Sequence, residues 1–435
     1  MATKKKSAPA GRRVAIVAGL RSPFAKSSTV YKDLTTLDLA NRVVAELLAR
    51  TGLPGKEIDH LVYGQVVPTI PTPNIAREIV LGIGLPKEIE AYSVVRACAT
   101  STQAVVSGAQ SILLGEADVV VAGGADSLSK PPITYRDRVV EALMKANSAR
   151  DPMSKLKAFS DVRAKDLLPQ PPAIAEFSTG KTMGQCAEVM AKANGITREA
   201  QDRFALRSHQ KASEGWEKGI FAQEVMPFPV GPSFQEVVEK DNMIRPDTTL
   251  EKLASLKTVF DRRHGTVTAA SASPLTDGAS AVILMSEEKA KALGYEPLAF
   301  VDAWAFAAID PSWQLLQGPA FAAPMALDKA GLTLDDMDII DMHEAFAAQV
   351  LSNIQALGSK SFAKEHLNRS KPVGEVPDEK LNLYGGSISI GHPFAATGTR
   401  QLLTVSRELE RRGGGKALIT QCAAGGMGAA VVLSR

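Results

Sequence analysis

The chain has 435 residues, and its 50 Lys and Arg residues against 47 Asp and Glu residues leave a formal charge of +3. Hydrophobic residues at 45% and charged residues at 22% are typical of folded globular proteins and exclude a largely disordered chain. The near balance of charge indicates no nucleic-acid partner. Because domains hold about 150 residues each, we expect more than one domain.

The N-terminal residues predict neither export nor a membrane anchor. Residues 1–13 carry basic residues and no acid, but no long apolar segment follows them, so we expect no secretory signal. No run of about 18 apolar residues occurs, which argues against a membrane-spanning helix. Three cysteines, an odd number, favour reduced thiols in a reducing compartment. We therefore expect a cytoplasmic location.

Two pairs of segments repeat one pattern along the chain. Residues 46–64, ELLARTGLPGKEIDHLVYG, align without gaps on residues 325–343, MALDKAGLTLDDMDIIDMH. A helix-like run and an apolar strand over residues 104–124 are echoed over residues 402–422. The strands are apolar on both faces, which is typical of sheets covered by helices on both sides. We therefore predict two α/β halves with the same plan.

The stretch between the halves has a different composition, with polar helices and a proline-rich patch. Its first part, residues 130–165, holds nine basic residues against four acidic ones, a local charge of +5. Such a segment is either a solvated surface or a contact for phosphates, an acidic partner or a membrane. We divide the chain into a first half (1–129 and 261–290), an inserted domain (130–260) and a second half (291–435).

Cys98 is a candidate nucleophile. It follows a strand-like stretch and precedes a helix-like run that opens with the hydroxyl residues Thr100, Ser101 and Thr102. We expect these hydroxyls to cap the helix and the thiol to lie at its N-terminus. Unpaired N–H groups and the helix dipole would stabilise a thiolate there and lower the pKa of Cys98. A buried structural cysteine is the alternative.

Two histidines are candidate partners for this thiol. His392 lies in the glycine-dense loop GGSISIGHP, where the backbone can pass close to a ligand, and is a candidate general base. His343 ends an apolar strand and opens the segment HEAF, at a turn where a side chain can project into a cleft. The duplication gives Cys98 and the His392 loop comparable places in the two halves. A pseudo-twofold arrangement would bring them together.

Cys422 is a second thiol in a reactive setting. It ends a strand and opens CAAGGMG, whose small residues let backbone N–H groups approach an oxyanion. Cys186 lies inside a helix-like stretch and is interpreted as a packing residue. We expect no metal site, because the cysteines and histidines are scattered without paired ligand spacing. We expect no dinucleotide site, because the run VAGGAD lacks the GxGxxG pattern.

Taken together and in this order, these motifs resemble the thiolases over residues 12–435. The resemblance rests on Cys98 and the helix behind it, and on GTVTAASASPLTDGAS, HEAF, GGSISIGHPFAATGTR and QCAAGGMG. It implies an α/β protein of the thiolase fold, a duplicated five-layer αβαβα sandwich with an inserted loop domain. It also implies a homodimer as the core assembly.

The resemblance implies an acyltransferase that cleaves 3-ketoacyl-CoA in fatty-acid β-oxidation. Cys98 would attack the keto carbon with His392 activating its thiol, and Cys422 would protonate the released acetyl-CoA carbanion. Coenzyme A would then take the shortened acyl group, as a co-substrate and not a permanently bound cofactor. One oxyanion pocket would use His392 and His343, and the other the backbone N–H groups of Cys98 and Ala424.

Departures from the common thiolase pattern point to a subgroup. Many thiolases have Asn at the position of His343 and Gly at those of Ser101, Ala395 and Ala424. The HEAF form and the long basic insert look like the thiolase subunit of the fatty-acid β-oxidation multienzyme complex. At His343 a ring nitrogen would donate directly, where Asn is thought to act through water. Ala424 would still offer its N–H group.

The same likeness implies binding residues and partners. Ser273 and Met183 match positions that line the coenzyme A site, and Lys257 matches a basic position there. The basic insert would serve a hydratase/dehydrogenase subunit in a hetero-oligomer, or a peripheral membrane contact.

Three alternatives remain beside a degradative thiolase. One is a biosynthetic acetoacetyl-CoA thiolase. Another is a decarboxylating ketoacyl synthase of the same fold, because Cys98, His343 and His392 form a Cys-His-His set; Cys422 argues against it, since such synthases need no second thiol. A non-catalytic scaffold that binds a partner through the basic insert is the third. The sequence predicts neither the acyl chain length nor the physiological direction.

Overall fold

A computed structural model describes residues 11–170, 175–231 and 234–435. Within these residues one large sheet has the strand order β10-β11-β12-β9-β1-β8-β5-β3-β4, and the short β2 (Ala25–Lys26) pairs with β8. The nine strands are β1 (Val14–Arg21), β3 (His60–Gly64), β4 (Glu90–Val94), β5 (Val119–Asp126), β8 (Thr276–Ser286), β9 (Ala299–Ala308), β10 (Ile339–Met342), β11 (Lys416–Ala423) and β12 (Met427–Ser434). Every residue of β1, β5 and β8 is buried, as expected for strands covered on both faces.

The two halves of the sheet repeat one pattern. β3 and β5 run parallel, as do β10 and β11, and an antiparallel strand flanks each pair, β8 beside β5 and β12 beside β11. A parallel bridge between Ile340 and Leu381 takes the place beside β10 that β4 has beside β3. The halves meet where β1 pairs with β9. The duplication predicted from the sequence is therefore present.

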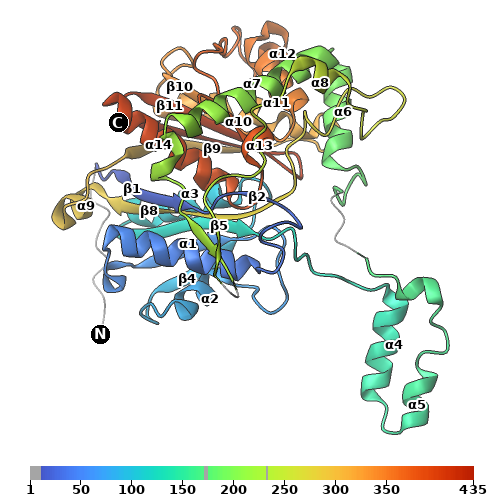
Figure 1. Ribbon diagram of the computed structural model, residues 1–435. Coiled ribbons are helices and arrows are strands. Elements are labelled where there is room, and N and C mark those ends of the chain that lie inside the picture. Colours follow the sequence, from blue (N-terminus) through green and yellow to red (C-terminus); the bar gives the residue numbers. More distant parts are fainter. Residues whose placement is uncertain (1–10, 171–174, 232–233) are drawn as a thin grey trace.

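Helices form three layers around the two halves of the sheet (Figure 1). The main helices are α1 (Thr36–Thr51), α2 (Ile75–Gly82), α3 (Thr100–Leu113), α10 (Gly318–Ala330), α11 (Ala347–Gly358) and α14 (Thr397–Arg412). α1 and α2 cover the first half, α10 covers the second, and α3 and α14 pack together between the halves. The close approach in this central layer requires glycine, since a Cβ at Gly398 would lie 2.3 Å from Thr102 Oγ1. The predicted αβαβα sandwich is confirmed.

The ends of α1 show how local sequence sets an element. Thr35 and Asp38 form a reciprocal capping box at its N-terminus, and Gly52 adopts a left-handed conformation at its C-terminus. Its buried side chains, including Leu39, Val43 and Leu47, recur at helical spacing and face the sheet. These signals fix the helix that covers the first half.

A long segment connects β5 to β8, and these two strands are antiparallel neighbours in the sheet. The chain therefore leaves the sheet after β5 and returns to the position beside it. The connecting segment contains α4 (Asp137–Ser148), α5 (Pro152–Lys157), α6 (Met183–Ala193), α7 (Arg198–Glu217), β6 (Phe228–Val230), β7 (Glu236–Val238) and α8 (Leu250–Ala254). α6 and α7 pack on α11 of the second half. The division at residues 129, 260 and 290 stays a prediction.

α4 and α5 project away from the sandwich as a separate pair of short helices (Figure 1). Apolar side chains on this pair are exposed, among them Met144 at 70%, Met153 at 73% and Leu156 at 72%. Among the described helices, none is long and apolar enough to cross a membrane.

Candidate active site

A tight turn carries Cys98 from the end of β4 to the start of α3. Ala97 has a left-handed φ of 44°, which is rare for a residue with a side chain. The N–H of Ala99 donates to the carbonyl of Arg96 at 3.0 Å, and the N–H of Thr100 donates to that of Ala97 at 3.0 Å. This turn places the thiol at the N-terminus of α3, as the sequence predicts.

The hydroxyls at the start of α3 do not cap it, so that prediction is wrong. The residue at the cap position is Ala99, which makes no side-chain cap. Ser101 Oγ accepts a bond of 2.9 Å from the N–H of Thr399, and Thr102 Oγ1 donates to Gln421 Oε1 at 2.8 Å. These hydroxyls therefore join the two halves behind the nucleophile.

The thiol of Cys98 is not a stabilised thiolate in this environment. Burial raises its pKa to about 12, although hydrogen bonds from its own N–H and from the N–H of Ala424 act in the opposite direction. The predicted lowering of the pKa is thus wrong, because desolvation of the sulfur outweighs the helix N-terminus. These two N–H groups are the ones that the resemblance to thiolases assigns to an oxyanion pocket. At rest this residue is a neutral thiol that needs a base.

His343 and His392 meet beside this thiol, although they come from separate segments. His343 follows β10, and His392 lies between the short α13 (Ser387–Ile390) and α14. The two rings have centroids 4.2 Å apart, and a ring nitrogen of each lies within 4.8 Å of the other and of Cys98 Sγ. Gly391 makes this entry possible, because its φ is 110° and a Cβ would lie 2.7 Å from Thr276 Cγ2.

Both imidazoles are neutral near pH 7. Burial lowers the pKa of His392 to about 3 and that of His343 well below its ordinary value, and the positive charge of Arg400 acts in the same direction. In the described part of the chain, neither Nε2 atom has a hydrogen-bond partner, and both are buried. Two neutral rings with free Nε2 atoms are therefore available to a thiol and a carbonyl oxygen.

Cys422 completes the group from the end of β11. It is fully buried, and it packs in an apolar cluster with Leu316, Phe346 and the predicted packing residue Cys186. Burial raises the pKa of its thiol well above the ordinary value, and the neighbouring Cys98 contributes in the same direction. A thiol that keeps its proton suits a group that must donate it to a carbanion.

The side chains of Cys98, His343 and His392 include the donor types of a zinc site, so the expectation of scattered ligands fails in space. Their donor atoms lie within 4.8 Å of one another. Two neutral imidazoles beside a thiol also suit proton transfer to a substrate placed among them.

The sequence matches two family models that together span nearly the whole chain. Residues 14–288 match the N-terminal domain of thiolase, and residues 295–435 match its C-terminal domain. The chain belongs to the thiolase family. Thiolases are acyltransferases, so the chain is an enzyme of that class, as predicted.

Known relatives support the same family over nearly the full length. A 3-ketoacyl-CoA thiolase of Pseudoalteromonas translucida is 54% identical over 425 residues, which cover 98% of this chain and 97% of the relative. One from Yersinia pestis is 54% identical over 423 residues, covering 97% of each. These matches favour thiolase chemistry over the ketoacyl synthase and scaffold alternatives.

Solved structures agree with the thiolase fold. Human mitochondrial 3-ketoacyl-CoA thiolase superposes with a TM-score of 0.83 at 32% identity, over 97% of this chain and 98% of that one. A structure of the human protein in complex with CoA gives a TM-score of 0.81 at 31% identity, with the same coverage. A Bacillus anthracis acetyl-CoA acetyltransferase gives 0.82 at 33%, again with the same coverage.

Buried polar residues that the sequence did not single out support the thiolase site. Glu344 Oε2 accepts from Ser208 Oγ at 2.6 Å, and its Oε1 accepts from Asn382 Nδ2 at 2.7 Å. The backbone N–H of Ile388 also donates to this carboxylate, at 3.2 Å. Glu344 thus holds the His343 turn against α13. Glu344 follows His343 in the HEAF motif, but its hydrogen-bond partners are distant in the sequence, so no local sequence pattern marks them.

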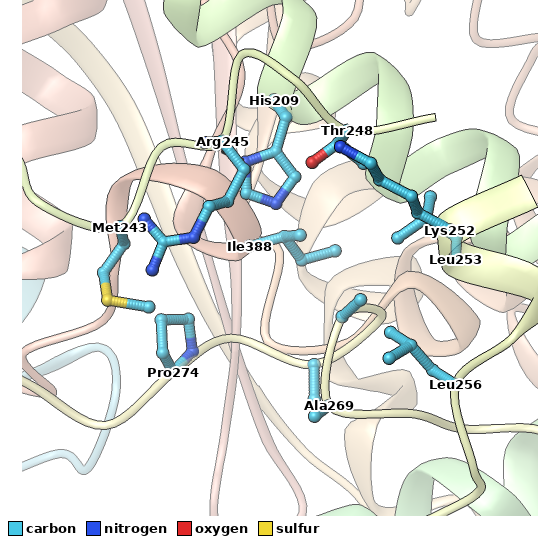
Figure 2. Close-up of a pocket in the computed structure, with 12 residues that line it drawn as sticks. His209, Met243, Arg245, Thr248, Lys252, Leu253, Leu256, Ala269, Pro274 and Ile388 are labelled. Carbon is cyan, nitrogen blue, oxygen red and sulfur yellow. Dashed lines mark hydrogen bonds between the residues drawn. The ribbon is translucent and has the colours of Figure 1, made fainter. Parts of the chain in front are cut away.

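A pocket of about 300 Å³ lies beside the predicted coenzyme A residues (Figure 2). Ala272 and Pro274 line it on either side of Ser273, and Leu256 lines it next to Lys257. Ser273 is partly buried and Lys257 is exposed, while Met183 packs outside this pocket on the Cys422 cluster. Ser273 and Lys257 are thus sequence neighbours of residues that line this pocket, although neither is itself a lining residue.

Proposed function

We propose that this chain cleaves 3-ketoacyl-CoA with coenzyme A to give acetyl-CoA and a shortened acyl-CoA, as a 3-ketoacyl-CoA thiolase of fatty-acid β-oxidation. The observation that carries the proposal is the meeting of Cys98, two neutral histidines and Cys422 around one point. These four groups supply a nucleophile, its base, an oxyanion donor and an acid. That is the set which this reaction needs.

In the first half-reaction Cys98 Sγ attacks the 3-keto carbon while His392 Nε2 accepts the thiol proton. The N–H groups of Cys98 and Ala424 stabilise the negative oxygen that forms on this carbon. The bond between the keto carbon and the α-carbon then breaks, and its electron pair becomes the enolate of acetyl-CoA. His343 and His392 stabilise the enolate oxygen, and Cys422 protonates the α-carbon.

In the second half-reaction the thiolate of Cys422 takes the proton of incoming coenzyme A. The sulfur of coenzyme A attacks the acyl group on Cys98, and the thiolate of Cys98 leaves and recovers its proton from His392. Both cysteines and the histidine return to their starting states. Run in reverse, Cys422 is the base of a Claisen condensation.

The pocket beside Ser273 suits the coenzyme A moiety. Arg245 and Lys252 place two cations on its wall, which can pair with phosphates. Apolar lining residues such as Met243 and Leu253 suit the rest of the ligand. Ile388, which also lines the pocket, follows Ser387, whose Oγ lies 3.1 Å from Nδ1 of His343. Met183 would contact the ligand nearer the thiols.

A homodimer is the assembly that we propose for the core. β4 is the last strand on one edge of the sheet, and Val95, which follows it, is 64% exposed. An unpaired edge with an exposed apolar side chain is suited to pairing with a second copy. Because this edge leads directly into Cys98, a dimer would also hold the nucleophile turn in place.

For the α4–α5 pair we propose a peripheral contact with an anionic membrane surface. The projecting helices expose apolar residues, and they lie within the segment of residues 130–165, which carries a local charge of +5. The triple variant K145E/K155E/K157E is expected to lose co-sedimentation with anionic liposomes. Liposome binding that survives the triple variant contradicts the membrane contact. Loss of binding to a hydratase/dehydrogenase subunit instead would assign the helices to that partner. A cytoplasmic location stays a prediction.

The test of the main proposal is cleavage of a long-chain 3-ketoacyl-CoA with free coenzyme A, followed by the loss of the 3-keto absorbance. We expect cleavage by the wild type and none by C98A. Acetoacetyl-CoA, assayed beside it, reports on the chain-length range. Cleavage of acetoacetyl-CoA alone would favour the biosynthetic alternative, and decarboxylation of a malonyl thioester without cleavage would overturn the proposal.

A further inference from the structure

We propose that Ser387, held by Arg400, fixes His343 as a hydrogen-bond donor at Nε2, while Thr397 fixes His392 as an acceptor at Nε2. The inference rests on the proposed function and assigns positioning residues to the same site. The two rings lie side by side, yet they would enter the reaction with opposite proton arrangements. The direction of the hydrogen bond at Nδ1 of each ring determines which ring nitrogen carries the proton.

Behind His343 a chain of donors runs in one direction. Arg400 is buried, always charged and can only donate, and its Nη2 lies 3.2 Å from Ser387 Oγ. Ser387 Oγ lies 3.1 Å from Nδ1 of His343. Ser387 Oγ accepts from Arg400, and among the described residues Nδ1 of His343 is the acceptor that lies within hydrogen-bond distance of the serine hydroxyl, so the serine proton is directed to Nδ1. In a neutral imidazole the ring proton must then be on Nε2.

Behind His392 the direction is reversed. The hydroxyl of Thr397 donates to the carbonyl of Pro393 at 3.1 Å, and that oxygen can only accept. Thr397 Oγ1 lies 2.6 Å from Nδ1 of His392 and offers it a lone pair. The ring proton of His392 is therefore on Nδ1, and Nε2 carries the free pair.

This asymmetry matches the order of the chemistry. His392 can accept the proton of Cys98 directly, because its Nε2 is unprotonated and carries a lone pair. His343 already presents an N–H to the carbonyl oxygen of the substrate before any proton has moved. His392 becomes a second donor only after it has accepted the thiol proton. If both rings carried the proton on Nε2, the site would lack a base. If both carried it on Nδ1, the site would lack a preformed donor.

The direct test is the tautomeric state of each ring, measured by long-range ¹H–¹⁵N correlation on protein labelled with ¹⁵N-histidine. The chain has six histidines, and the H343N and H392N variants assign the two signals of interest. We expect an Nε2–H pattern for His343 and an Nδ1–H pattern for His392 in the unliganded protein. S387A should shift His343 toward a mixture and leave His392 unchanged. The same pattern in both rings, or no response to S387A, would overturn the inference.

Kinetics separate the two positioning roles from a general loss of structure. S387A should lower kcat about tenfold to a hundredfold with KM within about twofold, and should leave the alkylation rate of Cys98 by iodoacetamide unchanged. T397V should lower kcat and the alkylation rate together, because it disturbs the base. The conservative variants S387T and T397S, which keep the hydroxyl, should recover most of the activity. Equal alkylation losses in S387A and T397V would contradict the assignment.

Failure of this inference is distinguishable from failure of the proposed function. The ¹⁵N spectra need no substrate, so they report on the tautomers even if the wild type does not cleave 3-ketoacyl-CoA. If the wild type is active and both rings have the same tautomer, the positioning roles are wrong and the thiolase reaction stands. If the wild type is inactive and the rings have the expected tautomers, the proposed reaction is wrong and the assigned hydrogen-bond directions stand.

Discussion

The carboxylate of Asp126, at the end of β5, accepts a hydrogen bond of 2.7 Å from the backbone N–H of Ala395. Its other oxygen accepts from the N–H groups of Val66 and Val67, each at 2.9 Å. Asp126 belongs to the first half, and Ala395 lies three residues beyond His392 in the second. One buried side chain thus connects the segment after β3 with the loop that carries His392, the proposed catalytic base.

We predict that D126N weakens both the fold and the reaction. An amide has one acceptor oxygen, so its NH₂ group would face a backbone N–H in a buried place. Leaving such a group unpaired costs about 1–3 kcal/mol in the free energy of unfolding. Urea unfolding measures this loss, and kcat should fall because the His392 loop moves. D33N, at an exposed aspartate, is the matched control. An unchanged unfolding free energy in D126N would contradict the role of Asp126.

The left-handed turn at Ala97 predicts that this position accepts glycine better than valine. A97G should keep the unfolding free energy within about 1 kcal/mol of wild type, since glycine relieves the positive φ while it loosens the unfolded chain. A97V should cost about 1–3 kcal/mol and lower kcat, because a β-branched residue resists this conformation and would displace Cys98. Thermal unfolding and cleavage assays on the two variants test this order. A valine variant as stable and active as the glycine variant would refute it.

The raised pKa of Cys98 predicts the pH dependence of its alkylation. With the pKa at about 12, the thiolate fraction is small at neutral pH and rises with each pH unit through pH 10. The rate of alkylation by iodoacetamide in the absence of substrate should therefore keep rising through pH 10. Mass spectrometry of the Cys98 peptide follows the rate at one site. A plateau that begins below pH 7 would show a thiolate–imidazolium pair at rest instead.

The buried histidines predict a loss of stability in acid. The pKa of His392 is lowered from about 6.5 to about 3, so the unfolded chain binds the proton first as the pH falls. The contribution of the neutral His392 ring to the free energy of unfolding is complete above about pH 6.5 and is lost as the pH falls toward 3. Between pH 7 and 5 this amounts to about 2 kcal/mol. H392N should show a smaller difference in unfolding free energy between these two pH values.

A matched control removes a histidine elsewhere. H264N lies at an exposed position of the same chain. It should keep the difference between pH 7 and pH 5 that the wild type shows. If H392N and the wild type lose the same free energy over this range, His392 is not buried as a neutral ring.

The sequence singled out the proposed catalytic residues partly because the duplication can be read in it. Cys98 and His392 each precede the central helix of their own half, and strand patterns around residues 60–64 and 339–343 revealed that repeat. His343 follows β10 directly, and Cys422 lies near the end of β11, both in the second half. Local patterns were enough to single out all four residues, and the repeat predicted that Cys98 and the His392 loop would meet.

The positioning residues were not predictable in the same way. Ser387 and Arg400 contact each other across thirteen positions, and Asp126 meets Ala395 across 269, so no local pattern marks either pair. The pKa of Cys98 was predicted in the wrong direction because the helix N-terminus is visible in a sequence and the desolvation of a sulfur is not. The hydroxyls of α3 were assigned to capping because their partners lie on α14 and β11.

The most direct measurement of the central claim is the mass of the protein after mixing with a 3-ketoacyl-CoA in the absence of free coenzyme A. We predict one added acyl group, located on the peptide that contains Cys98, in the wild type. C98A should carry no acyl group, and C422A should form it far more slowly, because the leaving enolate lacks its proton donor. Added coenzyme A should remove the acyl group from the wild type. No adduct, or an adduct on Cys186 or Cys422, would contradict the account.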